Sequence, residues 1–377
     1  MHIALNAWFW NRPDTGSGQY LRGLVDGLRK VAPDVRLTLI APEGWEITPP
    51  DGVALECIGL HGSGHLAKVR FEQSDFPRAA GKSGADLAHI PYWGGPLASP
   101  IPTVVTIHDL IPLVLPQYRG GALARLYTGL VAASARGASA VITDSPYSRQ
   151  DILAHLGLRP EHVTAIPLAA GEDYHPRQGS LVDLAIRKKY DLPPEFVLYL
   201  GGFDVRKNLP TLIKAYTYVK QGVGDAYPLV IAGRSPAQLT PRFSDVPKAI
   251  QAMQVEDVVQ LIGEVEEADK PALYRMAKCF VFPSRYEGFG LPVLEAMACG
   301  TPVVSTEASS IPDVAGDAAF LVPPDDARHM AGSIIAALIQ EDVAASLRQK
   351  GLARAGQFSW ARTAAETLAV YTRVMKG

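Results

Sequence analysis

The sequence predicts an α/β fold with two doubly wound parallel-sheet domains, and three observations support this prediction. Short apolar runs bounded by Gly, Pro or Asp recur along the chain in two series. Segments with apolar residues at helical spacing separate many of these runs, and an alternation of strand and helix favours parallel sheets with right-handed crossovers. A chain of 377 residues is also long enough for two domains, each with its own core.

The first series begins with the first residues of the chain. Its first two strands flank residues 19–30, where Leu21, Leu24, Val25 and Leu28 recur at helical spacing. Several of the runs are dense in Val, Ile and Leu, as expected of strands that are buried on both faces of a sheet. The predicted strands of this series are residues 3–7, 36–41, 54–60, 86–91, 103–107, 138–143 and 163–168.

The second series follows a polar stretch that contains Pro and Gly, at residues 171–180. Its predicted strands are residues 196–200, 228–232, 258–262, 279–283, 302–305 and 319–322, and its helices are residues 209–220, 270–278 and 292–299. After residue 325 the pattern is helical only, with a last helix at residues 360–375. We therefore predict a first domain at residues 1–175, a second at residues 176–360 and a C-terminal helical segment at residues 361–377.

Composition and charge exclude several classes of protein. With 47% hydrophobic and 20% charged residues, the chain is neither disordered nor a coiled coil. Its 36 basic and 38 acidic residues leave a formal charge of −2, so no overall positive field is available to bind nucleic acid. The sequence predicts no secretory signal and no membrane-spanning segment, because the N-terminal residues lack a basic region and no apolar run reaches the required length.

The three cysteines, Cys57, Cys279 and Cys299, are odd in number and widely spaced. This usage fits a reducing compartment and argues against a zinc cluster. We expect all three to be buried structural residues, and we expect the protein to be cytoplasmic.

Two segments of the first domain carry polar or glycine-rich chemistry at predicted strand ends. Gly16 and Gly18 follow the first strand and open the first helix, where glycine allows a close approach of backbone to ligand. A plain tight turn explains them equally well. His108 and Asp109 follow the strand at residues 103–107, and His108 there can bind a substrate, act as an acid or base, or cap local backbone. Asp109 is expected to orient the loop or His108.

The second domain has a basic pair after its first strand. Arg206 and Lys207 follow the glycine pair Gly201 and Gly202 and precede a helix. Arg offers a planar fork of N–H donors and Lys a point charge, so together they suit a diphosphate. A solvated surface pair is the alternative.

The most specific segment is residues 287–295, E-G-F-G-L-P-V-L-E. Pro292 suits the start of a helix and Gly300 suits its end, which places Glu287 in the loop and Glu295 about one turn into the helix. The backbone N–H groups at the helix start are available to phosphate or sugar oxygens, and the two carboxylates to hydroxyl groups. Two carboxylates are also typical of a glycosidase, but the intervening glycines favour a nucleotide-sized ligand.

These segments together resemble one family. Residues 287–295 match the E-x7-E pattern of the retaining nucleotide-sugar glycosyltransferases of family 4, which have the GT-B fold of two facing Rossmann-like domains with an interdomain cleft. The resemblance extends over nearly the whole chain. The other segments that carry it are G-S-G-Q-Y at residues 16–20, H-D at 108–109, R-K-N at 206–208, I-P-D-V at 311–314 and residues 318–323.

The resemblance implies a role for each matching residue. The second domain would bind the donor, with Arg206 and Lys207 neutralising its diphosphate, Glu287 binding hydroxyls of the sugar and Glu295 holding the ribose. Gly202 and the backbone of Phe289, Gly290 and Leu291 would complete the donor site. His108, Gly16 and Gly18 would act from the first domain, which binds the acceptor, and the C-terminal helix would cross back to that domain.

The acceptor side is less specific in sequence. Gln19 stands where Arg is frequent in the family, and Trp93 is able to stack on a sugar ring or to be a half-buried structural residue. The segment from Arg119 to Arg136 holds three arginines and no acid among apolar residues. We expect either an amphipathic helix packed on the sheet or a contact with an anionic membrane that carries a lipid-linked acceptor.

The resemblance also implies a reaction. The family transfers with retention, and no third carboxylate stands out as a covalent nucleophile, so we expect charge stabilisation and positioning to carry catalysis. No D-x-D motif occurs, and we predict neither a metal ion nor a cofactor. The subgroup suggests a mannosyltransferase of bacterial surface polysaccharides that uses GDP-mannose. Donors carrying glucose, rhamnose, galactose or N-acetylglucosamine on UDP or dTDP stay open, as do an epimerase and a non-catalytic nucleotide-sugar binding protein.

Overall fold

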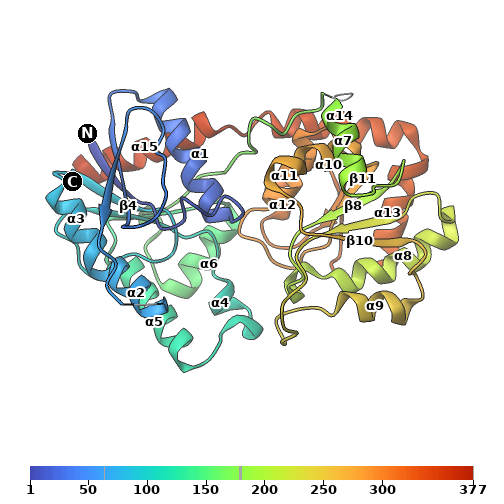
Figure 1. Cartoon of the computed structure of the whole chain (residues 1–377), viewed down its shortest axis with the longest axis horizontal. Coiled ribbons are helices and arrows are strands. Elements are labelled where there is room, and N and C mark those ends of the chain that lie inside the picture. Colours follow the sequence, from blue (N-terminus) through green and yellow to red (C-terminus); the bar gives the residue numbers. More distant parts are fainter. Residues whose placement is uncertain (63, 178–180, 377) are drawn as a thin grey trace. The chain divides into compact units, whose positions relative to one another are not determined.

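The computed structural model describes residues 1–62, 64–177 and 181–376, and the chain forms two compact units (Figure 1). One unit comprises Met1–Ala169 together with Ser359–Gly377, and the other comprises Ala170–Phe358. Residues 178–180 of the expected second domain and Gly377 of the expected C-terminal segment lie outside the described residues.

Within its described residues, the first unit holds one seven-stranded sheet in which every pair of neighbouring strands is parallel. The strand order is β3-β2-β1-β4-β5-β6-β7. All seven predicted strands of the first series are confirmed with small shifts at their ends. They are β1 (His2–Asn6), β2 (Arg36–Pro42), β3 (Val53–Ile58), β4 (Leu87–Ile90), β5 (Thr103–Thr106), β6 (Ala140–Thr143) and β7 (Val163–Ala165).

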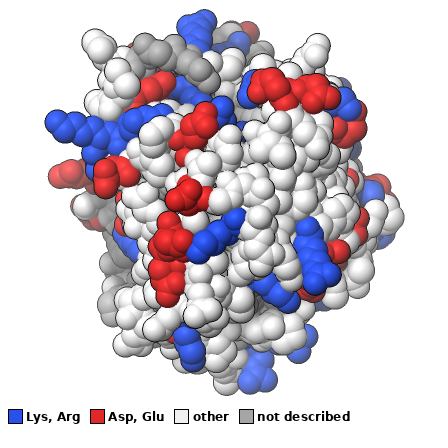
Figure 2. Space-filling view, turned by 90° about the vertical axis from the view of Figure 1, so that its right-hand side faces the viewer, with Lys and Arg blue, Asp and Glu red and all other residues white. Residues whose placement is uncertain are grey.

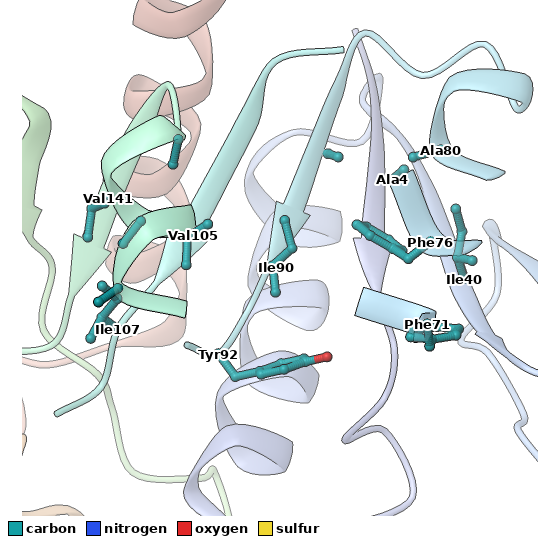
Figure 3. Close-up of a cluster of buried hydrophobic side chains, with 14 of the residues drawn as sticks. Ala4, Ile40, Phe71, Phe76, Ala80, Ile90, Tyr92, Val105, Ile107 and Val141 are labelled. Carbon is teal, nitrogen blue, oxygen red and sulfur yellow. The ribbon is translucent and has the colours of Figure 1, made fainter. Parts of the chain in front are cut away.

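The core of the first unit lies between this sheet and its helices. Figure 3 shows part of it, where Ala4, Ile90 and Val105 from neighbouring strands pack with Phe71 and Phe76. Its α-helices are α1 (Gly16–Val31), α2 (Gly64–Arg70), α3 (Phe76–Lys82), α4 (Ile111–Val114), α5 (Ala122–Gly137), α6 (Pro146–Leu156) and the C-terminal α15 (Trp360–Lys376).

The C-terminal helix α15 packs on α1. Gly23 and Gly27 of α1 make room for Trp360, because a Cβ atom built on Gly23 meets the Trp360 ring at 2.3 Å. On Gly27 it meets the Trp360 carbonyl oxygen at 2.4 Å. The last helix therefore belongs to the first unit.

The second unit repeats the architecture. In its described residues a six-stranded parallel sheet has the order β10-β9-β8-β11-β12-β13. Its strands are β8 (Val197–Leu200), β9 (Leu229–Ala232), β10 (Val259–Gly263), β11 (Cys279–Phe282), β12 (Val303–Thr306) and β13 (Phe320–Val322), which confirms the second predicted series. Its α-helices are α7 (Leu181–Lys189), α8 (Leu209–Val223), α9 (Val246–Met253), α10 (Lys270–Met276), α11 (Leu291–Ala298), α12 (Ile311–Ala315), α13 (Ala327–Ile339) and α14 (Glu341–Ala355).

Both sheets have a point where the strand order reverses. It lies between β1 and β4 in the first unit and between β8 and β11 in the second. Ligands of doubly wound sheets bind outside the carboxyl ends of the strands at this point. In the second unit this places the segments after β8 and β11, which carry Arg206, Lys207 and Glu287, beside each other.

On the side where Figure 1 labels α8, α9 and α13, basic and acidic side chains are interspersed (Figure 2). The expectation that all three cysteines are buried is wrong for Cys57, which is exposed near the end of β3, a strand at the edge of the sheet. Among the described residues no single helix meets the length and apolarity required to cross a membrane. One pair bent by 97°, Ala327–Ile339 with Glu341–Lys376, meets them jointly.

Candidate functional site

The segment after β8 folds into a tight basic turn. Val205–Lys207 forms one turn of 3-10 helix, and Asn208 follows with φ 58°, a left-handed conformation that Asn tolerates well. The Asn208 amide donates to the Pro324 carbonyl at 2.7 Å and accepts from the Thr211 hydroxyl at 2.7 Å. Asn208 thus ends the turn and begins α8, which holds Arg206 and Lys207 at the carboxyl end of the sheet.

Glu287 brings the two cations together. Its Oε1 lies 2.7 Å from Lys207 Nζ and 2.8 Å from Arg206, and it accepts a hydrogen bond of 2.6 Å from Ser284 Oγ. These contacts all fall on Oε1. Oε2 has no hydrogen bond from the described part of the chain, so it is available to a ligand hydroxyl.

The loops after β8 and β11 are also joined through their backbones. Arg206 donates to the Tyr286 carbonyl at 3.0 Å, and the Arg285 N–H donates to the Arg206 carbonyl at 2.7 Å. The Lys207 ammonium lies 4.6 Å from the centroid of the Phe282 ring, on β11. The charged groups are therefore held by several contacts that do not depend on one another.

Because the charged groups of this cluster are buried close together, each one shifts the pKa values of the others. Burial alone would raise the pKa of Glu287, but Arg206 and Lys207 outweigh it and lower that pKa to about 2. The pKa of Lys207 is lowered by burial and by the neighbouring Arg206 charge, which Glu287 and Asp204 oppose. Glu287 is an ionised carboxylate of low basicity at any physiological pH.

Helix α11 begins beside this cluster with unpaired backbone donors. Gly290 caps the helix with φ 112°, a conformation that glycine adopts without strain. In the described residues the N–H groups of Phe289, Gly290 and Leu291 have no hydrogen-bond partner, whereas Ser310 Oγ donates to the Phe289 carbonyl at 2.7 Å. The expected free donors at the helix start are present and point to an anion or sugar oxygen.

Glu295 lies apart from the cation cluster. Its Oε2 accepts a 2.9 Å hydrogen bond from the Tyr274 hydroxyl on α10, and its side chain is buried. Burial raises the pKa of Glu295 to about 7, although Lys270 and the Tyr274 hydroxyl oppose the rise. The two carboxylates of one motif therefore have different surroundings and different charge near neutral pH.

Gly202 lies in the turn that follows β8. Its carbonyl accepts a 2.6 Å hydrogen bond from the Tyr199 hydroxyl, and a Cβ atom there would lie 2.8 Å from Asp204 Oδ2. A side chain at this position would therefore have to displace the Asp204 carboxylate.

His108 lies in the first unit with a buried acid. Its Nδ1 lies 2.8 Å from Asp144 Oδ2 and its Nε2 lies 3.2 Å from the Pro91 carbonyl. Both partners are acceptors, so both nitrogens carry protons in this geometry. Burial lowers the pKa of His108, but Asp144, with Asp109 and the Pro91 carbonyl, outweighs it and the net shift is upward. Asp109 orients its own loop by accepting from the Ile111 N–H at 3.0 Å.

The other residues that the sequence singles out in the first unit are two glycines and two larger side chains. Gly16 opens α1 with open space around its Cα. A Cβ atom on Gly18 would lie 1.9 Å from the Arg12 carbonyl oxygen, so this glycine serves a close approach within the chain itself. Gln19 is half-buried on α1, and the half-buried Trp93 donates from its indole to the Val131 carbonyl at 3.1 Å.

Sequence reasoning missed two side chains of these clusters. Asp144 directly follows β6, and Ser284 comes two residues after β11. Both are polar residues at the carboxyl ends of parallel strands, a signal that was present in the sequence. Their partners are 36 residues away for Asp144 and three for Ser284.

Among the described residues no three His, Cys, Asp or Glu side chains are grouped so that they could hold a metal ion.

Comparisons with known proteins agree with this architecture. The family model "Glycosyl transferases group 1" matches residues 183–354, and "Glycosyl transferase 4-like domain" matches residues 15–169. The sucrose-phosphate synthase of Thermosynechococcus elongatus has a similar structure, with a TM-score of 0.78 at 21% identity over 100% of this chain and 99% of that one. This likeness shows the GT-B fold.

Two curated Escherichia coli proteins are similar in sequence. The serotype-specific mannosyltransferase WbdA is 31% identical over 279 residues, which are 74% of this chain but 34% of WbdA. The O-antigen chain mannosyltransferase B is 32% identical over 269 residues, 71% of this chain and 69% of that protein. With two family models in succession and a relative matched over most of both chains, this protein belongs to the family 4 glycosyltransferases and is mannosyltransferase-like.

Proposed function

We propose that this glycosyltransferase moves mannose from GDP-mannose to a saccharide or lipid-linked saccharide and forms an α-glycosidic bond with retention. The product is part of a surface polysaccharide or glycoconjugate. The names of the mannosyltransferase relatives support the sugar, and the O-antigen relative supports the class of product. Residues 176–360 bind the donor, and residues 1–175 bind the acceptor.

The observation that carries the proposal is the Arg206, Lys207 and Glu287 cluster at the strand-order reversal of the second sheet. Two cations held beside a helix start suit the two phosphates of a nucleotide sugar. Phe203 of the same loop is buried and uncharged, so the diphosphate depends on Arg206 and Lys207.

The remaining donor contacts are proposed for the other residues of the matching segments. Oε2 of Glu287 accepts from hydroxyls of the donor sugar, and Glu295 holds the ribose. The N–H groups of residues 289–291 bind sugar and phosphate oxygens, and the Gly202 turn lies against the diphosphate. His108, whose imidazole lies between Asp144 and the Pro91 carbonyl, is proposed as the first unit's contact with the donor sugar.

The proposed reaction takes place on one face of the sugar. The acceptor oxygen forms a bond to the anomeric carbon as the bond from that carbon to the β-phosphate oxygen breaks. The electron pair stays on the phosphate, which takes the proton of the acceptor hydroxyl. Arg206 and Lys207 stabilise the charge on the leaving diphosphate, and Glu287, with a pKa of about 2, is too weak a base to take that proton.

We further propose that the transfer needs no metal ion, because Arg206 and Lys207 supply the positive charge at the diphosphate. We expect activity to be unchanged after treatment with EDTA and gel filtration, measured as release of nucleoside diphosphate in the presence of acceptor. Loss of activity that added Mg²⁺ or Mn²⁺ restores would contradict this.

The donor site is tested by thermal-shift binding with a panel of GDP-, UDP- and dTDP-sugars. A ligand that binds only the folded state raises the melting temperature, so GDP-mannose is expected to stabilise the wild type but not Arg206→Ala/Lys207→Ala. Lys220→Ala is the matched control, since it removes a cation from an exposed pair with Asp257. A shift that survives in the double variant would refute the site.

The class of reaction needs a second readout. A transferase releases nucleoside diphosphate only when an acceptor is present, whereas an epimerase acts on the donor alone and a binding protein releases nothing. Stabilisation by a UDP- or dTDP-sugar in place of GDP-mannose would keep the site and correct the donor.

The acceptor side is proposed to contact the cytoplasmic face of a membrane through the exposed start of α5. Leu123 is 84% and Leu126 is 72% exposed there, with Arg119 and Arg125 exposed beside them. No Asp or Glu occurs from residue 110 to residue 143, so the segment complements anionic lipid. This supports a lipid-linked acceptor.

Vesicle sedimentation tests this contact. The wild type is expected to sediment with vesicles that contain anionic phospholipid and not with zwitterionic ones, and Leu123→Ser/Leu126→Ser is expected to stay in solution. Leu181→Ser/Leu184→Ser is the control, because these α7 residues are similarly exposed, at 85% and 64%. Equal sedimentation of both variants would rule out α5 as the contact.

A further inference from the structure

The buried face of α15 carries a row of hydroxyl groups. Thr363, Thr367 and Tyr371 follow one another at four-residue spacing, so they lie on one side of the helix. Each is at most 1% exposed. Thr363 Oγ1 donates to the Pro167 carbonyl at 2.7 Å, and the other two face the interior of the first unit. A helix that merely covers a sheet buries apolar residues there, so this polar row calls for a reason.

Tyr371 begins a chain of buried polar contacts. Its hydroxyl lies 2.6 Å from His89 Nδ1, and His89 Nε2 lies 2.8 Å from Thr106 Oγ1. Thr106 Oγ1 in turn lies 3.1 Å from the Tyr20 hydroxyl. These contacts join α15, β4, β5 and α1, and the His89 and Tyr371 positions are 282 residues apart in sequence.

The series of contacts ends at His108. The ring of Tyr20 lies edge to face with the His108 ring, with centroids 5.0 Å apart and planes at 81°. Asp144 holds the other side of the imidazole, at 2.8 Å from Nδ1. His108 is therefore fixed between a carboxylate and a tyrosine whose own position depends on α15.

The protonation states of the residues in this series agree with a role in holding His108 in place. Burial lowers the pKa of His89 to about 3, so this imidazole is neutral, and its Coulombic interaction with His108 acts in the same direction. Burial raises the pKa of Tyr20, although the hydroxyls of Thr106 and Thr367 oppose that rise. Asp144, Asp109 and the Pro91 carbonyl raise the pKa of His108, whereas Tyr20, Thr106 and Tyr371 are not among the causes of its shift.

We propose that Tyr371 of the C-terminal helix is a positioning residue for His108, acting through His89, Thr106 and Tyr20. Seating of α15 on α1 orients the imidazole, and loss of that seating releases it. The inference rests on the proposed function insofar as His108 contacts the donor sugar. The hydrogen-bonded series from Tyr371 to Tyr20 is suited to this task because a buried polar network favours one arrangement and penalises others.

The first test reads the imidazole itself. The protein, labelled with ¹⁵N in its nine histidines, is compared as wild type and as Tyr371→Phe, which keeps the ring and removes only the hydroxyl. The His108 signals are identified by their loss in His108→Ala. We expect them to shift in Tyr371→Phe. The matched control, Thr363→Val, removes a hydroxyl from the same face of the same helix and is expected to leave the His108 signals in place.

The second test reads catalysis. We expect Tyr371→Phe to lower kcat by about tenfold, since small displacements of a reacting group are costly, while KM for the donor stays within about twofold. In a His108→Ala background the same substitution is expected to change kcat by less than about twofold, because a residue that acts only through His108 has nothing left to position.

The outcomes separate the two proposals. Unchanged His108 signals in Tyr371→Phe, or an equal shift in Thr363→Val, overturns the inference whether or not the enzyme is active. Additive losses of kcat in the two variants also overturn it. Absence of any transfer by the wild type contradicts the proposed function and leaves the spectroscopic result to decide the link between Tyr371 and His108.

Discussion

Two glutamates of one nine-residue segment show how surroundings set chemistry at the scale of a residue. Glu287 touches two cations and a hydroxyl and has a pKa of about 2. Glu295 is buried against Tyr274 and has a pKa of about 7. The same side chain is thus fully ionised at one position and half-protonated near neutral pH at the other, which suits different ligand atoms.

Glu295 makes the stability of the protein depend on pH. Its folded-state pKa of about 7 lies above the ordinary 4.5, so its contribution is fully present below pH 4.5 and is lost as the pH rises to about 7. We expect this to amount to about 3 kcal/mol at most. Urea unfolding of wild type and Glu295→Gln between these pH values checks it. Glu295→Gln should not lose unfolding free energy as the pH rises from 4.5 to about 7. The exposed Glu256→Gln should lose as much as the wild type. Parallel curves for wild type and Glu295→Gln would disprove the assignment.

Ser284 is expected to matter through Glu287. Ser284→Ala removes a 2.6 Å charge-assisted hydrogen bond and leaves both cations in place. Such bonds contribute about 1.5–3 kcal/mol, so kcat/KM for the donor should fall about tenfold to 100-fold. Ser305→Ala is the control, because that buried hydroxyl donates to the Phe282 carbonyl and touches no carboxylate. A similar loss of activity in both variants would show a general packing effect.

Among the helices and loops, the start of α11 is the part of the proposed donor site that depends most on backbone conformation. Gly290 places the free N–H groups of the first turn beside the Glu287 loop, and it does so at φ 112°. A side chain at that φ is strained even though the nearest atom to an added Cβ is 3.9 Å away. The requirement is therefore conformational and not steric crowding.

Gly290→Ala is expected to destabilise the protein by about 1–2 kcal/mol and to weaken donor binding. Gly332→Ala is the matched control, since this exposed glycine inside α13 has open space around it and alanine favours a helix by up to about 1 kcal/mol. Thermal unfolding with and without donor measures both. If Gly290→Ala proves as stable as Gly332→Ala, the strained cap is not a requirement.

At the scale of the whole molecule, the last helix returns the chain to the unit in which it began. Residues 359–377 belong with residues 1–169, and α15 packs closely on α1 across Gly23 and Gly27. The C-terminal helix is therefore part of the first unit's structure, and through Tyr371 it reaches His89.

Gly27→Ala tests this seating. An added Cβ would lie 2.4 Å from the Trp360 carbonyl oxygen and 2.9 Å from Ala364 Cβ, so α15 must shift, at a cost of about 1–3 kcal/mol. We expect faster proteolysis between α14 and α15 in this variant. Gly129→Ala, on α5 with nothing within 4 Å, should be cut at the wild-type rate. Resistance of Gly27→Ala to the protease would mean that α15 tolerates the change.

The two parallel sheets, the helices between their strands and the position of the charged segments at strand ends can all be predicted from the sequence. These features are local, because periodicity, capping residues and apolar runs are read within a dozen residues. Arg206, Lys207 and Glu287 could be assigned to one site for the same reason, since parallel strands bring their carboxyl ends to one edge.

The contacts between individual side chains, in contrast, can be seen only in the folded chain. One oxygen of Glu287 contacts both cations and Ser284. His108 pairs with Asp144, and Tyr371 contacts His89, which is 282 residues away in sequence. Cys57 is exposed on an edge strand. Such contacts depend on sheet order, register and helix seating, which arise from packing of the whole chain and leave no periodic signal in the sequence.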